Sequence, residues 1–64
     1  MFKIIKVDIL EKEAKFIRAN VIYFRGSVSN VIPARIVGNV LTLDRAFDIE
    51  HRKMIKAAIL DAAN

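Results

Sequence analysis

The segment KFIRANVIYF, which covers residues 15–24, decides the fold of this 64-residue chain. It is rich in β-branched and aromatic side chains, which favour strands over helices. The members that carry this preference are Ile17, Val21, Ile22, Tyr23 and Phe24. The segment therefore predicts a strand, and it makes the residues before it the first arm of a hairpin.

A helix over residues 9–19 is the alternative to that hairpin. Asp8 and Glu11 are spaced for a capping box, and Glu11 and Lys15 are spaced for a helical ion pair. A helical stripe also exists, made of Leu10, Ala14, Ile17 and Val21. The rival hairpin would turn within residues 11–14, whose Glu-Lys-Glu-Ala sequence is poor turn chemistry. We favour the hairpin, because the helix would split a segment that is β-forming throughout.

Three further strands are predicted, one before this segment and two after it. Residues 2–10 are rich in Ile and Val, and residues 28–37 and 40–43 are also extended in character. Arg25-Gly26-Ser27 and Gly38-Asn39 are turn signals between the strands. Pro33 cannot donate a hydrogen bond, so the third strand should be an edge strand or contain a bulge near this residue.

From Phe47 onward the apolar period changes from that of a strand to that of a helix, over residues 48–62. The predicted buried face consists of Phe47, His51, Met54, Ile55, Ala58, Ile59 and Ala62. Asp48 is the expected N-cap, with Asp44 as its rival. Arg52, Lys53 and Lys56 are expected on the opposite, solvated face. The predicted fold is therefore α+β: one domain with a small antiparallel meander of three to four strands and one C-terminal helix packed on one face.

The composition indicates more apolar surface than so short a chain can bury. Hydrophobic residues make up 55% of the sequence, whereas a domain of this size buries only about 60% of its unfolded surface. Alternation places Ile5, Val7 and Ile9 on one face of the first strand and Phe2, Ile4 and Leu10 on the other. One helix covers one face of a sheet, so a second apolar face should remain. Its expected members are Phe2, Ile4, Phe16, Ile22 and Phe24, and we expect them to form an interface in a homodimer or higher oligomer, or with another protein.

No motif for catalysis, a cofactor or a metal is present. The chain has no cysteine and a single histidine, His51, which is too few ligands for zinc. Ser27 and Ser29 flank a turn without a base nearby, and Arg25-Gly26-Ser27 is a weak phosphate cradle. We expect no enzymatic activity, no cofactor and no small-molecule substrate. Neither a secretion signal nor a membrane-spanning segment is evident, so the cytoplasm is the expected location.

The basic residues suggest the first functional hypothesis. The net charge is +4, and arginine side chains match phosphates and base edges well. The candidate contacts to DNA or RNA are Arg18, Arg25, Arg35 and Arg45, assisted by Arg52, Lys53 and Lys56. A dimeric nucleic-acid-binding accessory or regulatory protein is therefore our first hypothesis. The alternative is an inhibitor or adaptor module that binds a protein through the exposed apolar sheet face or an open strand edge.

Overall fold

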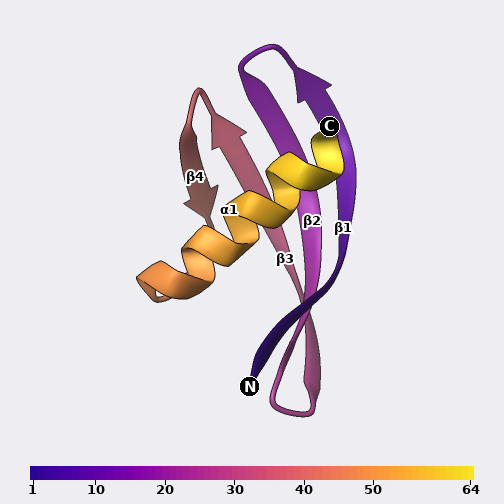
Figure 1. Cartoon of the computed structure of the whole chain (residues 1–64), viewed down its shortest axis with the longest axis vertical. Helices are drawn as coiled ribbons and strands as arrows, with labels where there is room; N and C mark the ends of the chain where they lie inside the picture. Colours follow the sequence, from indigo (N-terminus) through magenta and orange to yellow (C-terminus); the bar gives the residue numbers. More distant parts are fainter.

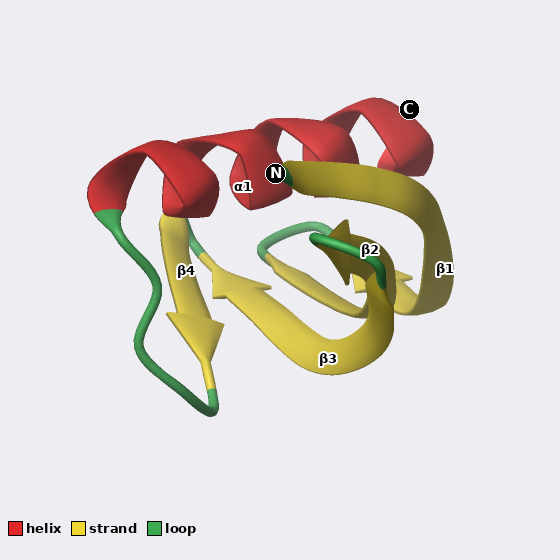
Figure 2. Ribbon diagram, turned by 90° about the horizontal axis from the view of Figure 1, so that it is seen from below, coloured by secondary structure: helices red, strands yellow, loops and turns green.

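A computed structural model describes all 64 residues, which form a four-stranded antiparallel meander followed by one helix. The strands are β1 (Phe2–Glu13), β2 (Phe16–Arg25), β3 (Val28–Val37) and β4 (Val40–Leu43), and they lie in this order in the sheet; helix α1 covers Ile49–Ala63. The helix crosses the sheet diagonally, with its C-terminal end near β1 (Figure 1). The strongly curved sheet bends around the helix, so that one face is covered and the other is open (Figure 2). The predicted α+β fold is confirmed.

Residues 9–19 belong to the first hairpin, as favoured, and do not form the alternative helix. β1 continues to Glu13, which pairs with Phe16, so the turn consists of Ala14 and Lys15. The two later turns contain Gly26 and Gly38, each with a φ close to +60°. A positive φ at the first of two central residues is typical of type II′ hairpin turns, and glycine adopts it without strain. Local turn chemistry therefore sets the register of the second and third hairpins.

The core lies between the sheet and the helix. The residues with almost no exposed surface are Val21, Ile32, Ile36, Ile55 and Ile59. Every second residue of β2 and β3 points to this side, which is the alternation that the sequence predicts. On the helix, Ile55, Ile59 and Ala63 are buried, whereas Met54 and Ala62 are exposed and so do not belong to the predicted buried face.

The face assignment predicted for β1 is wrong. The pairing with β2 shifts register between Ile4 and Lys6 and again between Ile9 and Glu11, which leaves Ile5 and Leu10 as bulges. An extra residue in a strand reverses the alternation beyond it. Phe2 and Ile4 consequently pack on the core beneath the helix, together with Val7 and Ile9, and do not share a face with Phe16, Ile22 and Phe24.

Side chains cap both ends of helix α1 by hydrogen bonds to its backbone. Asp48 is the N-cap of α1 and accepts a hydrogen bond from the backbone N–H of His51 at 2.9 Å, so the rival cap Asp44 is not used. Lys12, from β1, donates to the backbone oxygen of Ala63 in the last turn of the helix, where a positive charge is favourable.

β4 pairs only with residues 34–37, so Pro33 lies just where β3 loses its outer neighbour, as expected. The single helix lacks the length and apolarity that crossing a membrane would require.

Candidate nucleic-acid interface

The side of the sheet that the helix does not cover, here called the open face, is organised in rows across the strands. The β2–β3 ladder runs without a register shift from Phe16 to Arg25, so residues on this face lie directly opposite one another. The pairs, from the Lys15 end to the Gly26 end, are Phe16 with Val37, Arg18 with Arg35, Asn20 with Pro33, Ile22 with Val31, and Phe24 with Ser29. Polar rows therefore lie between two apolar groups.

Arg18 and Arg35 form the central pair of this face. Like charges at directly opposed positions repel each other across about 5 Å. The Nε atom of Arg18 lies 3.5 Å from a carboxylate oxygen of Glu11 on β1, which balances one of the two charges. Arg35 forms no ion pair or hydrogen bond within the chain. The pair therefore leaves one guanidinium, with its five donors, free for an external ligand.

The apolar part of the open face is divided into two groups by this polar band. One group contains Phe16 with Val37 and Val40; the other contains Ile22 and Phe24 with Val31. Val31, Val37 and Val40 each expose more than half of their surface, and Phe24 exposes 38%. The continuous patch expected from the sequence is thus replaced by two smaller ones.

Strand β1 contributes only charged side chains to the paired rows of this face. They change from basic to acidic along the strand, in the order Lys3, Lys6, Asp8, Glu11 and Glu13. Lys6 and Asp8 form an ion pair with a 3.3 Å separation. At the acidic end, a side-chain hydrogen bond with Glu11, and then the repulsion of its charge, raise the pKa of Glu13. The open face is thus a mixed-charge surface on its β1 side and an arginine-bearing surface at its centre.

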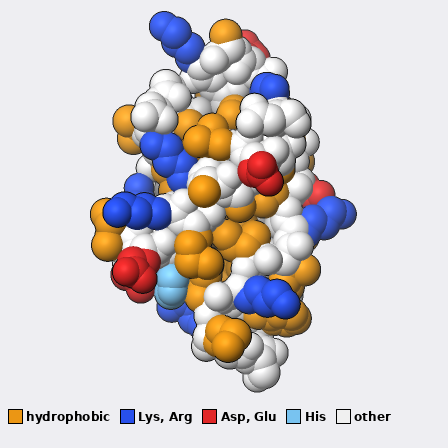
Figure 3. Space-filling view, in the orientation of Figure 1, with side chains coloured by type: hydrophobic (Ala, Val, Ile, Leu, Met, Phe, Trp, Pro, Cys, Tyr) orange, Lys and Arg blue, Asp and Glu red, His pale blue; other side chains and the backbone are white.

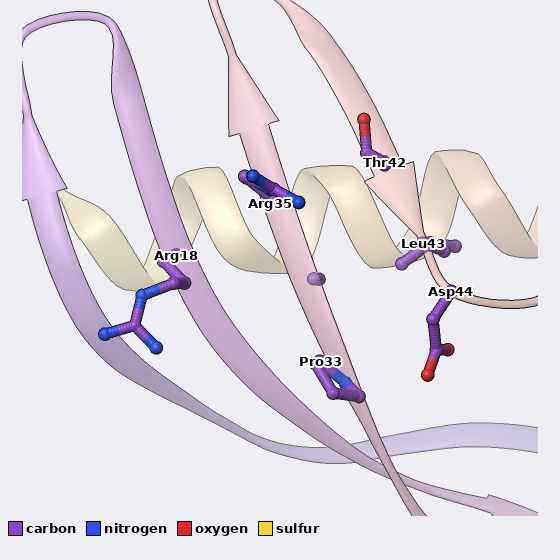
Figure 4. A pocket seen from close by; sticks show the side chains of 7 residues that line it. Arg18, Pro33, Arg35, Thr42, Leu43 and Asp44 are labelled. Carbon is purple, nitrogen blue, oxygen red and sulfur yellow. The ribbon is translucent and has the colours of Figure 1, made fainter.

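A shallow pocket of about 340 Å³ opens between β3 and β4, beside the arginine pair (Figure 4). Its lining combines donor, acceptor and apolar groups: Arg18, Pro33, Ala34, Arg35, Thr42, Leu43 and Asp44. Thr42 lies opposite Arg35, and Asp44 follows directly after β4, beside Pro33. One oxygen of Asp44 lies 3.4 Å from Nε of Arg45. Pro33, Thr42 and Asp44 were not predicted to take part in binding, although counting outward from the Gly38-Asn39 turn would have placed Thr42 opposite Arg35.

The other candidate arginines and lysines do not join the Arg18–Arg35 pair. Arg25 lies over the rings of Phe2 and Phe47, at 6.0 and 5.5 Å from their centroids, at the far end of the sheet. These two rings and that of Tyr23 form an aromatic cluster, and the guanidinium covers it by a cation–π contact. Arg25 therefore has a packing role, whatever else it contacts.

The basic residues of the helix lie close to β4 instead of on a fully solvated face. Arg52 donates to the backbone oxygen of Leu41 at 2.7 Å, and Lys56 donates to that of Asn39 at 2.6 Å. These bonds satisfy carbonyl groups at the end and outer edge of the sheet, which would otherwise be open to another strand. Lys53 makes no such bond. On the helix side of the molecule, Lys and Arg side chains are scattered instead of gathered in one patch (Figure 3).

His51 belongs to the aromatic cluster and not to a ligand set. Its ring stacks on Phe2, with centroids 4.1 Å apart and an angle of 13° between the planes. Its Nδ1 atom, which makes no hydrogen bond, lies 3.4 Å from a carboxylate oxygen of Asp48. Nowhere in the chain do three or more His, Cys, Asp or Glu side chains gather as metal ligands.

Comparison with known proteins adds nothing to this description: no family model, no curated protein and no solved structure matches the chain. The arrangement of the open face is therefore the basis for a functional proposal.

Proposed function

We propose that this chain is a non-enzymatic accessory protein that binds single-stranded nucleic acid on the open face of its sheet. The observation that carries the proposal is the direct opposition of Arg18 and Arg35, of which only Arg18 has an acidic partner. A phosphate group beside the pair would relieve the repulsion between the two guanidinium groups and would accept their hydrogen bonds. Binding an anion would thus stabilise this part of the sheet.

Phe16 adds a stacking surface to the arginine pair. It lies next to Arg18 on the same face of β2 and is partly exposed. Aromatic rings beside basic side chains hold single strands, because every base can stack and every nucleotide carries a phosphate. Double-stranded nucleic acid hides its base faces, so the proposal favours a single strand.

The test is a titration of a fluorescently labelled 15-nucleotide single strand, followed by anisotropy at several salt concentrations. We expect the double variant R18Q/R35Q to weaken binding at least tenfold and to lower the salt slope by about 1.4, which corresponds to two lost phosphate contacts. The matched control is R45Q/K53Q, which removes the same charge from outside the pair and should stay within about twofold of the wild type. Equal losses in both variants would mean that only net charge matters, and absent or salt-independent binding would refute the proposal.

We also propose that two copies associate through the apolar group at the Gly26 end of the open face. Ile22, Phe24 and Val31 are neighbours there and lie away from Arg18 and Arg35, so a dimer seam at this end would leave the arginine pair accessible. Light scattering should give the mass of a dimer at both low and high salt, and F24E should give a monomer with an unchanged circular dichroism spectrum. A wild-type monomer would contradict the dimer.

A protein-binding inhibitor or adaptor is the second candidate function, and the exposure of Val31, Val37 and Val40 favours it. Three exposed valines on one face are more than the nucleic-acid proposal uses. If the wild-type chain is a monomer that binds no nucleic acid, these valines become the surface to test with protein partners.

A further inference from the structure

The pocket between β3 and β4 has donors on one side, from Arg18 and Arg35, and the carboxylate of Asp44 on the other, with the hydroxyl of Thr42 beside them. Arg35 offers only donors, and Asp44 offers only acceptors. The Arg35–Thr42 and Ala34–Leu43 pairs place Asp44 beside Pro33, one step along the strand from Arg35 on the same face (Figure 4). The Cα atoms of residues in such a diagonal relation are about 7–8 Å apart, so side chains that extend from both can contact one ligand in the pocket.

The two groups are free to bind a ligand. Arg35 has no partner within the chain, and Asp44 uses one oxygen toward Arg45 and leaves the other without a partner. Between them the pocket is lined by the ring of Pro33 and by Ala34 and Leu43, whose side chains pack toward the core, so a planar ring can lie against Pro33 and the strand backbone. A phosphate fits between Arg18 and Arg35 on the β2 side, but one placed between Arg35 and Asp44 would be repelled by the carboxylate. The ligand that fits both ends is therefore a neutral ring with acceptors on one edge and donors on another.

We infer that this pocket binds a guanine base of a single strand. Guanine presents the adjacent acceptors O6 and N7 to an arginine fork, and its N1–H and N2 amino groups are adjacent donors for a carboxylate. Adenine and cytosine would place an amino donor toward Arg35, and thymine and uracil have one ring N–H where Asp44 can accept two. In a duplex the N1–H edge is already paired, whereas a single strand leaves it accessible.

The inference rests on the proposed function and adds the identity of the preferred base. The arginine pair binds any strand through phosphates, whereas the pocket distinguishes one base from the others. The two statements can therefore fail separately, and a base-substituted oligonucleotide series separates them.

The experiment compares a 15-nucleotide all-thymidine strand with the same strand carrying one central guanine, which is too few to form a quadruplex. We expect the single guanine to tighten binding about tenfold, as one bidentate contact does. Inosine, which lacks the N2 amino group, and 7-deazaguanine, which lacks N7, should each lose most of this gain. One adenine in the same position should give no comparable gain.

Two protein variants test the residues assigned to the two edges. D44N should bring the ratio of affinities for the guanine-containing and all-thymidine strands close to one. R35K keeps the charge but not the fork, so guanine and 7-deazaguanine should then bind alike. D61N, which removes a carboxylate on the helix, should keep the wild-type ratio.

Four results would overturn the inference. If the guanine-containing and all-thymidine strands bind equally and salt weakens both, the proposed function stands and the base preference is refuted. If adenine gives the same gain as guanine, stacking accounts for the preference. If guanosine monophosphate alone binds as tightly as the strand, the pocket belongs to a free nucleotide. If no strand binds at all, the proposed function fails together with the inference.

Discussion

The two faces of the sheet differ in burial and in residue type, although they are built from alternate residues of the same strands. In β3, Ile32 is completely buried under the helix, while its neighbour Val31 exposes 53% of its surface on the open face. The covered side of β2 and β3 carries mainly aliphatic and small residues, whereas the open side carries an arginine pair between two apolar groups. Strand alternation thus lets one segment supply both the core and a candidate binding surface.

Truncating Ile32 and Val31 separately measures how much each face of the sheet contributes to stability. I32A should lower the free energy of unfolding by about 2–5 kcal/mol, since it removes buried methyl groups and leaves a cavity. In the monomeric F24E background, V31A should cost less than about 1 kcal/mol, because its side chain is already half in water. Urea denaturation of both variants measures the difference, and the lower strand propensity of alanine affects both. A larger loss in V31A when Phe24 is present would be the effect of the proposed dimer seam, whereas an equal loss in the F24E background would contradict the exposure of Val31.

The edge bonds of β4 should give the next largest effect. R52M removes the donor to the backbone oxygen of Leu41, and we expect unfolding to become easier by about 1–2 kcal/mol. K53M, at the next position of the helix, makes no such bond and should remain within about 0.5 kcal/mol of the wild type. Thermal denaturation of the two variants compares them directly. Equal stability would show that water replaces the arginine at this edge without loss.

Much of the fold follows from local patterns in the sequence, and the reason is physical. The strand preference of residues 15–24, the glycines of two turns and the Asp48 cap each act over a few residues, so they can be identified without the rest of the chain. The bulges at Ile5 and Leu10 cannot, because they depend on how β1 pairs with β2. For that reason the facing of Phe2 and Ile4 was predicted wrongly.

The candidate site is less predictable than the fold. That Arg18 faces Arg35 is a consequence of register, which the Gly26-Ser27 turn sets and which composition does not reveal. That Arg52 and Lys56 bond to backbone oxygens near β4 depends on the diagonal crossing of the helix, which no local pattern encodes. Residue types identify candidate contacts, but only pairing and packing show which of them meet.

The helix cap should have a smaller effect, of about 1 kcal/mol. D48A removes the acceptor of the His51 backbone N–H and the negative charge near the helix N-terminus, so helix α1 should fray and the melting temperature should fall. D61A, a change of the same charge in the last turn of the helix, is the control and should not reduce stability. A drop in D61A as large as that in D48A would contradict the capping role.

The smallest expected effect concerns the acidic end of β1 on the open face. The pKa of Glu13 is raised, mainly by its hydrogen bond with Glu11 and then by charge repulsion, so the folded chain binds this proton more tightly than the unfolded chain does. The corresponding stability is present below the unfolded pKa of about 4.3 and is lost as pH rises through the raised folded value. E13Q removes the titrating group, so its melting temperature relative to that of the wild type should rise with pH across this range and level off above it. E50Q, far from Glu11, should not show this change, and a constant difference between E13Q and the wild type at every pH would exclude the coupling.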